Sequence, residues 1–301
     1  MLFIASLAAF GTATCWALSA IISSTATRHF GAIRFARTRY LLVLGPMLLL
    51  AFVFGDWSNW TTEAFIFMGL SGLLGVFLGD TLLFAGHARL GPRLGSVIFS
   101  TAAPMTEVLN WLVLGSSFNL LKLLGILVIS TGVMTAIFFG KRHGPVHKLE
   151  SLNGPLWIGL TVMLLSALCQ AIGTIIAKPA LDMGLDPFSG ASWRVAISVL
   201  AYLALMLLVP TSWTRSEDHG PYTPKMTGLA ALSGTLGMLI GMTLFIWALS
   251  IGDAGIVAAV ASTAPLVQLP ILWVLTRQAP TIGAWAGSGL AVLGGVMIVL
   301  S

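Results

Sequence analysis

The sequence predicts an all-α polytopic membrane protein whose ten transmembrane helices form two inverted repeats of five. Three observations predict this class. Of the 301 residues, 57% are hydrophobic and only 8% are charged, whereas soluble globular chains carry roughly 25% charged residues. Apolar runs long enough to span a bilayer recur along the whole chain. Short motifs from the first half also return, in the same order, in the second half.

The apolar runs divide into spans because about 20 apolar residues cross the hydrocarbon core of a bilayer. The loops between the spans are too short to hold a separate soluble domain. The ten expected helices are Leu2–Ile22, Tyr40–Phe54, Phe65–Phe84, Leu94–Leu114, Leu120–Phe139, Leu156–Ala177, Phe188–Val209, Met226–Leu249, Ile256–Leu275 and Ile282–Leu300.

An internal repeat is the strongest pattern in the sequence. The segment Ser71-Gly72-Leu73-Leu74-Gly75 returns 162 residues later as Ser233-Gly234-Thr235-Leu236-Gly237. Other matches follow in order at offsets from 154 to 163, namely Cys15 with Cys169, Arg39 with Arg194, Pro104 with Pro265 and Gly132 with Gly295. We therefore expect a first five-helix repeat at residues 1–140, an inter-repeat loop at 141–153 and a second five-helix repeat at 154–301.

The odd number of helices in each repeat fixes how the repeats are related. The first helices of the two repeats must start on opposite sides of the membrane, so the repeats are inverted. Inverted repeats are typical of secondary transporters, which bind their substrates near the midplane between the halves. The spacings Gly75-xxx-Gly79 and Gly237-xxx-Gly241 predict close helix contacts in the third helix of each repeat.

The positions of Lys and Arg give an orientation. Twelve of the 15 lie after odd-numbered helices, and only Lys122, Lys178 and Arg194 lie on the other side. The positive-inside rule then places both termini outside the cytoplasm. Arg39 and Arg194 stand near the expected helix ends, where we expect interfacial anchors or partners of helix ends rather than substrate ligands.

A proline and a polar residue interrupt the fourth helix of each repeat. In the first repeat Pro104 precedes Glu107 by three positions, and Asn110 follows after three more, so all three share one helical face. In the second repeat Pro265 precedes Gln268. A charged side chain within a span costs a few kcal/mol at least, so Glu107 is a candidate site for substrate or a coupling proton. The alternative is a kinked helix in which Glu107 bonds a neighbouring helix.

Asp80 is the second acid within a span. It lies about 12 Å from Glu107 along the membrane normal at ~1.5 Å per residue, which favours a proton relay or a gate over a catalytic dyad. The alternative is an ion pair with Arg39 or Arg89. The repeat equivalent of Asp80 is Met242, so any coupling charge belongs to the first half.

Four further residues are candidate cavity residues. Trp16 and Gln170 are repeat equivalents in the first helix of each half, and an aromatic ring there can stack on a substrate. Thr243 and Trp247 share a helical face at i and i+4. For all four, packing against helices or lipid is the alternative interpretation.

Several short motifs carry a family resemblance. Ala88-Arg89-Leu90-Gly91 precedes an apolar run with a proline in mid-helix, and Leu124-Gly125-Ile126 and Ser130-Thr131-Gly132-Val133 close the repeat. This pattern resembles the EamA-type drug/metabolite transporters. The resemblance implies ten helices, alternating access, export of small metabolites or amino acids, and cytoplasmic termini, contrary to the charge count. Many relatives have Gly-Glu in the loop after the fourth helix. In this chain Gly115-Ser116 and Thr276-Arg277 occupy those places.

These patterns predict a secondary active transporter of the cell membrane. We expect it to export a small amino-acid-like or amphipathic metabolite, with the proton as candidate coupling ion. A non-transporting membrane subunit and an intramembrane enzyme are the alternatives, although the spans hold no H-E-x-x-H motif or Ser/His pair, and His87 falls at a helix end. We expect a monomer or homodimer in the lipid bilayer that binds no cofactor, metal or nucleic acid and has no catalytic residue.

Overall fold

The computed structural model describes residues 1–140, 147, 150–208 and 220–300, and its secondary structure within these ranges is helical throughout. Most of the predicted inter-repeat loop, at 141–146 and 148–149, lies outside the described residues. The first half contains α1 (Leu2–Phe30), α2 (Ala32–Phe54), α3 (Thr62–Ser71), η1 (Gly72–Leu78), α4 (Gly79–Phe99), α5 (Ala102–Leu114) and α6 (Leu120–Phe139).

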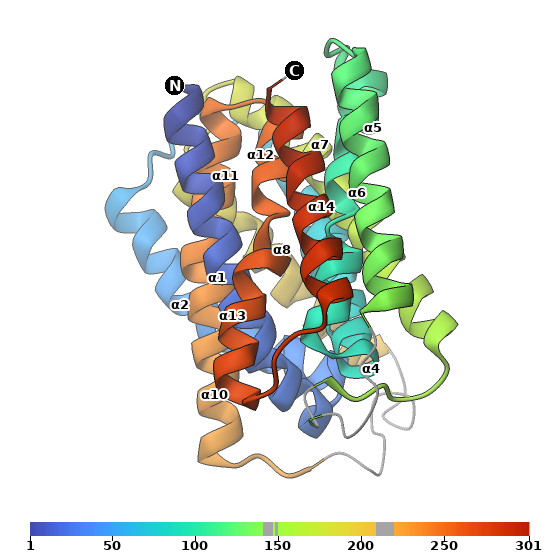
Figure 1. Ribbon diagram of the computed structural model, residues 1–301. Coiled ribbons are helices and arrows are strands. Elements are labelled where there is room, and N and C mark those ends of the chain that lie inside the picture. Colours follow the sequence, from blue (N-terminus) through green and yellow to red (C-terminus); the bar gives the residue numbers. More distant parts are fainter. Residues whose placement is uncertain (141–146, 148–149, 209–219, 301) are drawn as a thin grey trace.

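The second half repeats this order of helices. It contains α7 (Leu156–Asp182), α8 (Pro187–Leu208), α10 (Pro224–Gly234), η3 (Thr235–Met242), α11 (Thr243–Ile251), α12 (Ala254–Ala261), α13 (Ala264–Thr276) and α14 (Ile282–Val299). The helices stand side by side in one elongated bundle (Figure 1).

The described helices account for about ten crossings of a membrane. Nine stretches of the described chain are long and apolar enough to be spans, but one of them, Thr62–Leu114, has 53 residues. At 1.5 Å per residue it would measure about 80 Å, more than twice the roughly 30 Å of a bilayer core. Gly91 divides it, with non-helical φ 77° and ψ 165°. Both termini lie at the same end of the bundle (Figure 1), as an even number of crossings requires.

The largest errors in the expected helix boundaries lie between the first two helices. α1 continues to Phe30 and α2 begins at Ala32, with only Gly31 between them at φ 76°. Arg34 and Arg37 therefore lie in a helix instead of a loop. The expectation that Arg39 and Arg194 are interfacial anchors was also wrong, because they are only 2% and 0% exposed inside the bundle. The early start of α2 carries Arg39 two turns into the helix.

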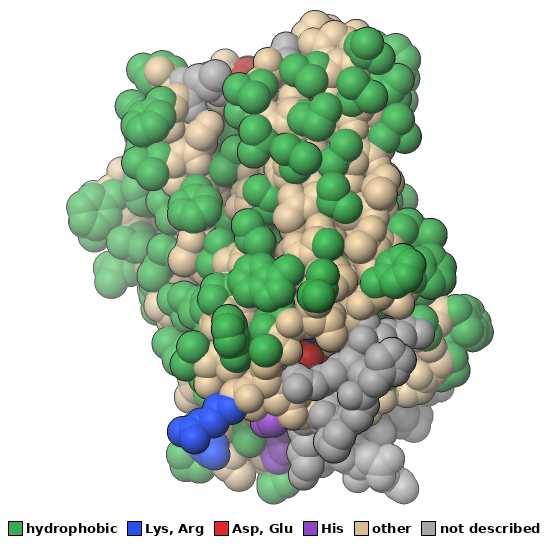
Figure 2. All heavy atoms as spheres, in the orientation of Figure 1, with side chains coloured by type: hydrophobic (Ala, Val, Ile, Leu, Met, Phe, Trp, Pro, Cys, Tyr) green, Lys and Arg blue, Asp and Glu red, His purple; other side chains and the backbone are tan. Residues whose placement is uncertain are grey.

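The outer surface is apolar, as a lipid-facing surface requires. Figure 2 shows hydrophobic side chains over most of the visible face, with Lys and Arg at its lower end. Phe52, Leu207 and Ile282 expose 83%, 86% and 89% of their surface. Polar side chains such as Thr12, Ser71 and Ser198 are buried instead, where the helix backbone can accept their hydrogen bonds.

The third helix of each half contains a π-helical segment. η1 and η3 occupy equivalent places in the repeat, and they begin at or directly after the glycine of the Ser-Gly motif. Carbonyl groups at the C-terminal end of each segment accept hydrogen bonds from the first helix of the other half, Gly241 within η3 and Gly79 directly after η1. Ser166 donates to the Gly79 carbonyl at 2.8 Å, and its repeat equivalent Thr12 donates to the Gly241 carbonyl at 3.2 Å. π-Helical segments often occur at functional sites.

The same segments hold the two halves together. A Cβ on Gly75 would meet the Gly173 Cα at 3.3 Å, and a Cβ on Gly237 would meet the Ser19 Oγ at 2.6 Å. Ser71 donates to the Gly173 carbonyl at 2.6 Å, and Ser19 donates to the Ser233 carbonyl at 3.0 Å. The predicted close helix contacts of the small residues are therefore confirmed, and they join one half to the other.

Candidate functional site: a cavity between the halves

A cavity of about 70 Å³ lies between the two halves, with room for roughly five water molecules. Its walls follow the internal repeat, because many lining residues of one half are matched by their equivalents in the other. Eight such pairs line it: Trp16 with Gln170, Ala20 with Thr174, Asp80 with Met242, Leu83 with Phe245, Ser96 with Ala258, Phe99 with Ala261, Ser100 with Ser262, and Ala102 with Ala264.

Both broken helices border this cavity. α4 ends at Phe99 and α5 begins at Ala102, while α12 ends at Ala261 and α13 begins at Ala264. Pro104 and Pro265 stand in the first turns of α5 and α13, where a backbone N–H would have no helical partner. Ser100 and Ser262, which lie at the breaks, both line the cavity, and so does Pro265.

Asp80 is the only acid among the residues that line this cavity. Its Oδ2 atom lies 3.6 Å from Arg39 Nη1 and accepts a hydrogen bond from the Tyr40 hydroxyl. Arg39 also donates through Nη2 to Ser19 Oγ and to the Ser233 carbonyl, both at 3.3 Å. The ion pair is the alternative that the sequence left open for Asp80, and it places both charges in the cavity wall.

The second half contains the cation of this pair without its acid. Arg194 is the repeat equivalent of Arg39 and is fully buried. Its Nη1 atom contacts Met242 Sδ at 3.3 Å, where the first half has a carboxylate, and its Nε and Nη2 atoms have no hydrogen-bond partner. Asp80 lies within electrostatic range of Arg194 as well. Two buried guanidinium groups thus share one carboxylate.

Trp16 and Gln170 are repeat equivalents in the cavity lining, but their hydrogen bonding differs. Trp16 Nε1 donates to the Gly237 carbonyl of η3 at 3.1 Å, and its ring lies 5.2 Å from that of Phe245. The Gln170 Nε2 atom has no hydrogen-bond partner, although the residue is only 6% exposed. Gln170 therefore presents a free donor to the cavity.

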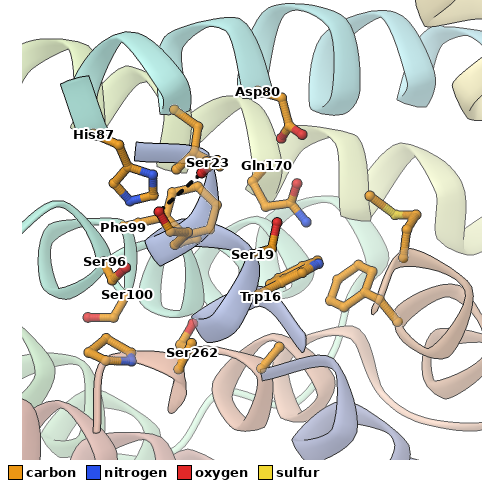
Figure 3. A pocket seen from close by; sticks show the side chains of 18 of the residues that line it. Trp16, Ser19, Ser23, Asp80, His87, Ser96, Phe99, Ser100, Gln170 and Ser262 are labelled. Atoms are coloured by element: carbon orange, nitrogen blue, oxygen red, sulfur yellow. Dashed lines mark hydrogen bonds between the residues drawn. The ribbon is translucent and has the colours of Figure 1, made fainter. Parts of the chain in front are cut away.

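His87 is a cavity residue that the sequence reasoning missed. It lies inside α4, is 2% exposed and has no partner for either ring nitrogen. A Cβ on Gly95 would lie 2.4 Å from His87 Cδ2, so the glycine makes room for the ring. The available signal was its spacing of seven residues from Asp80 on one helical face. Figure 3 shows His87, Asp80 and Gln170 around the cavity.

Glu107 and Asn110 lie outside the cavity, in a second polar cluster. Glu107 is fully buried and its Oε1 atom lies 2.6 Å from Lys122 Nζ of α6. Asn110 donates to both carboxylate oxygens of Asp253, at 3.2 Å and 3.0 Å. Asp253 caps the start of α12, so this cluster joins the first half to the second. Figure 1 places α12 toward the end of the bundle that holds both termini.

The remaining predicted site residues do not line the cavity. Trp247 is 39% exposed, and Thr243 is half-buried without lining it. The π-helical η3 precedes them, and each π turn contains an extra residue that rotates the following face. Met242 and Phe245 point to the cavity instead. Gln268 is fully buried beyond the cavity lining, and neither of its amide atoms has a hydrogen-bond partner.

Comparisons with known proteins agree with this architecture. The model of a family described as the EamA-like transporter family matches residues 3–138 and again residues 157–300. The uncharacterized transporter YvbV of Bacillus subtilis (strain 168) is 27% identical over 226 residues, which are 74% of this chain and 68% of that protein. A solved crystal structure with 15% identity covers 98% of this chain and 96% of its own, with a TM-score of 0.71, and shows the same fold.

Proposed function

The chain belongs to the EamA-like transporter family, and on that premise we propose that it exports a small organic metabolite by secondary active transport with alternating access. The family and the name of the bacterial relative point to a transporter rather than an enzyme. Nine apolar stretches, one of them long enough for two crossings, make it a multi-pass protein of the cell membrane. The substrate, the direction of transport and the coupling ion are the proposed parts.

The observation that supports alternating access is the matched lining of the cavity. Eight pairs of repeat-equivalent residues surround it, so the pseudo-two-fold axis passes through the binding space. In an inverted repeat, exchange of the two half conformations opens such a space first to one side and then to the other. The broken helices at Ser100 and Ser262 border this space, where bending needs the fewest backbone bonds to break.

The lining favours a solute with a polar head and an apolar body. Trp16, Phe84 and Phe99 offer apolar faces, while Gln170, His87 and the serine hydroxyl groups offer hydrogen bonds. Arg39 and Asp80 add both signs of charge to one wall. Small concave sites of this kind, mostly apolar with a few fixed polar groups, are typical of ligand pockets. An amino-acid-like or amphipathic metabolite fits this lining.

The shape of the cavity supports export. Three residues that lack a lining equivalent, Ser23, Phe84 and His87, extend the lining along α1 and α4 toward the turns at Gly31 and Gly91. That end of the bundle carries Arg28, Arg34 and Arg89. By the positive-inside rule it is the cytoplasmic end, from which an exporter must load its substrate.

The two buried acids have different proposed roles in coupling. Asp80 lines the cavity and is placed to bind substrate or a proton. Glu107 is ion-paired with Lys122 beside the Asn110–Asp253 link between the halves. A proton on Glu107 would leave Lys122 without its buried partner and change the charge beside that link. Protonation of Glu107 would thereby couple a proton to the movement of the halves.

Transport by purified protein in proteoliposomes tests this proposal. A thermal-shift screen of amino acids, purines and organic cations selects the solutes, and counterflow of a labelled solute then measures transport. We expect flux that depends on a pH gradient in the wild-type protein. Glu107→Gln should transport without that dependence. Absence of flux for every stabilising solute would overturn the transporter, and an unchanged pH dependence in Glu107→Gln would overturn the coupling role.

A further inference from the structure

The charged groups around the central cavity do not balance. Arg39 and Asp80 line it, and Arg194 lies directly behind Met242, another lining residue. These three side chains are 2%, 7% and 0% exposed. Two cations and one anion leave one positive charge in the interior. The other buried cation of the described spans, Lys122, is already paired with Glu107 in the separate cluster.

An uncompensated cation in a membrane interior is costly, so a binding partner for it is expected. Isolated buried charges cost many kcal/mol unless they are paired and hydrogen-bonded. Among the described residues, the Arg194 guanidinium donates only to the thioether sulfur of Met242. A thioether is a weak acceptor. The repeat shows what is missing, because Asp80 stands at the equivalent position beside Arg39.

Two unused donors mark the place where an anion would bind. Arg39 Nε and Gln170 Nε2 are buried and have no hydrogen-bond partner, and both residues line the cavity. Figure 3 shows Gln170 and Asp80 near the middle of the cavity lining, with His87 to their left. Planar guanidinium and amide donors suit the two oxygens of a carboxylate.

We propose that the cavity takes an anionic solute, whose carboxylate binds Arg39 and Gln170 while the charge of Arg194 attracts it through the Met242 wall. This inference rests on the proposed transport function and names its substrate class, which is a monocarboxylate with an apolar body. The cargo supplies the negative charge that the second half lacks. An inorganic anion such as chloride shares the chemistry, and the test separates the two.

Binding of three probes with one carbon skeleton tests the charge preference directly. The probes are 3-phenylpropionate, its amide and 3-phenylpropylamine, titrated into purified wild-type protein in chloride-free sulfate buffer. We expect the carboxylate to bind at least about tenfold more tightly than the amide, and the amine to bind most weakly. Equal affinities, or tightest binding of the amine, would overturn the proposal. Stabilisation by chloride but not by 3-phenylpropionate would assign the site to an inorganic anion and overturn the cargo assignment.

Met242→Asp compared with Met242→Asn tests the origin of the preference. The aspartate gives Arg194 the acid that Arg39 has, whereas the asparagine has nearly the same shape without the charge. We expect 3-phenylpropionate to bind Met242→Asp about tenfold more weakly than Met242→Asn. Equal affinities would contradict the charge argument. Gln170→Leu gives a second reading, because it removes a proposed carboxylate donor, and it should weaken binding of the carboxylate more than binding of the amine.

Transport separates failure of this inference from failure of the proposed function. If proteoliposomes move only solutes without net negative charge, the transporter stands and the anion site is wrong. If 3-phenylpropionate binds with the expected charge preference but no solute is transported, the anion site stands and the transport function is wrong.

Discussion

The two halves of the molecule agree in their backbone contacts and differ in their buried charges. Ser166 donates to the Gly79 carbonyl as Thr12 donates to the Gly241 carbonyl, so the C-terminal end of each π-helical segment is held in the same way by the opposite half. The polar chemistry is not shared. Asp80 pairs with Arg39 in the first half, whereas its equivalent Met242 faces Arg194 in the second.

This difference separates two tasks within one fold. In the proposed alternating access, contacts between equivalent backbone groups can exchange between the halves, so we assign them to the movement. A charge present in only one half cannot be exchanged in this way, so we assign it to the proposed cargo or the proposed coupling proton. Glu107 is a second charge of this kind, because its repeat equivalent Gln268 is neutral.

Removal of the shared carboxylate is expected to have the largest effect. Asp80→Asn leaves two buried guanidinium groups without an acid, and we expect the free energy of unfolding to fall by about 5 kcal/mol. Met242→Leu, at the equivalent position, should cost less than about 1.5 kcal/mol because it conserves volume. Unfolding of the detergent-solubilised variants measures both losses. Equal losses would contradict the claim that the charge at position 80 matters more for stability than the side chain at position 242.

The Glu107–Lys122 pair should give a smaller loss, because one acid there meets one base. We expect about 3 kcal/mol from Glu107→Gln or from Lys122→Met alone, since each leaves a buried charge unpaired. The double variant should lose much less than the sum of the single losses. Additive losses in this double-mutant cycle would mean that the pair is not coupled.

The contact between Gly75 and Gly173 tests the packing of the halves. A Cβ on Gly173 would lie 2.7 Å from the Gly75 Cα atom, which cannot move aside. We expect Gly173→Ala to cost about 1–3 kcal/mol. Gly228→Ala is the matched control, because a Cβ there would meet nothing within 4 Å, and it should be neutral or slightly stabilising. A control as unstable as Gly173→Ala would refute the contact.

The smallest expected effect on stability concerns Tyr222, in the loop before the third helix of the second half. Tyr222 bonds Thr38 and Arg37 of α2 and its ring lies 4.1 Å from the Arg34 guanidinium, whereas its equivalent Trp60 bonds Ser189. Burial raises the pKa of Tyr222, but these hydrogen bonds and the Arg37 charge outweigh burial and bring the pKa to about 8. The unfolded phenol titrates near 10.

The sign of the pH dependence follows from the lowered pKa. Between about pH 8 and pH 10 the unfolded chain holds more protons at Tyr222, so its contribution to stability rises with pH and is lost as the pH falls through 8. The difference in unfolding midpoint between wild type and Tyr222→Phe isolates this contribution. A difference that does not change between pH 7 and pH 10 would contradict it.

Much of the fold could be predicted from the sequence, because apolar length, repeats and helix breakers are local signals. The broken helices at Pro104 and Pro265 and the contacts at Gly75 follow from such signals. The partner of Glu107 could not be predicted, because Lys122 is close only after α5 and α6 pack together. Thr243 and Trp247 were expected to line the cavity from a regular helix. Because the π-helical η3 precedes them, the helix is rotated and neither residue lines the cavity. His87 went unrecognised because it was placed at a helix end.

An exchange of the cavity acid between the halves tests the central claim most directly. Asp80→Met alone leaves two unpaired cations, and we predict that it abolishes counterflow of the identified solute in proteoliposomes. The double variant Asp80→Met/Met242→Asp moves the carboxylate from Arg39 to its equivalent, Arg194. Because the repeat builds both walls alike, we predict that the double variant recovers transport. A double variant as inactive as Asp80→Met alone would contradict the account.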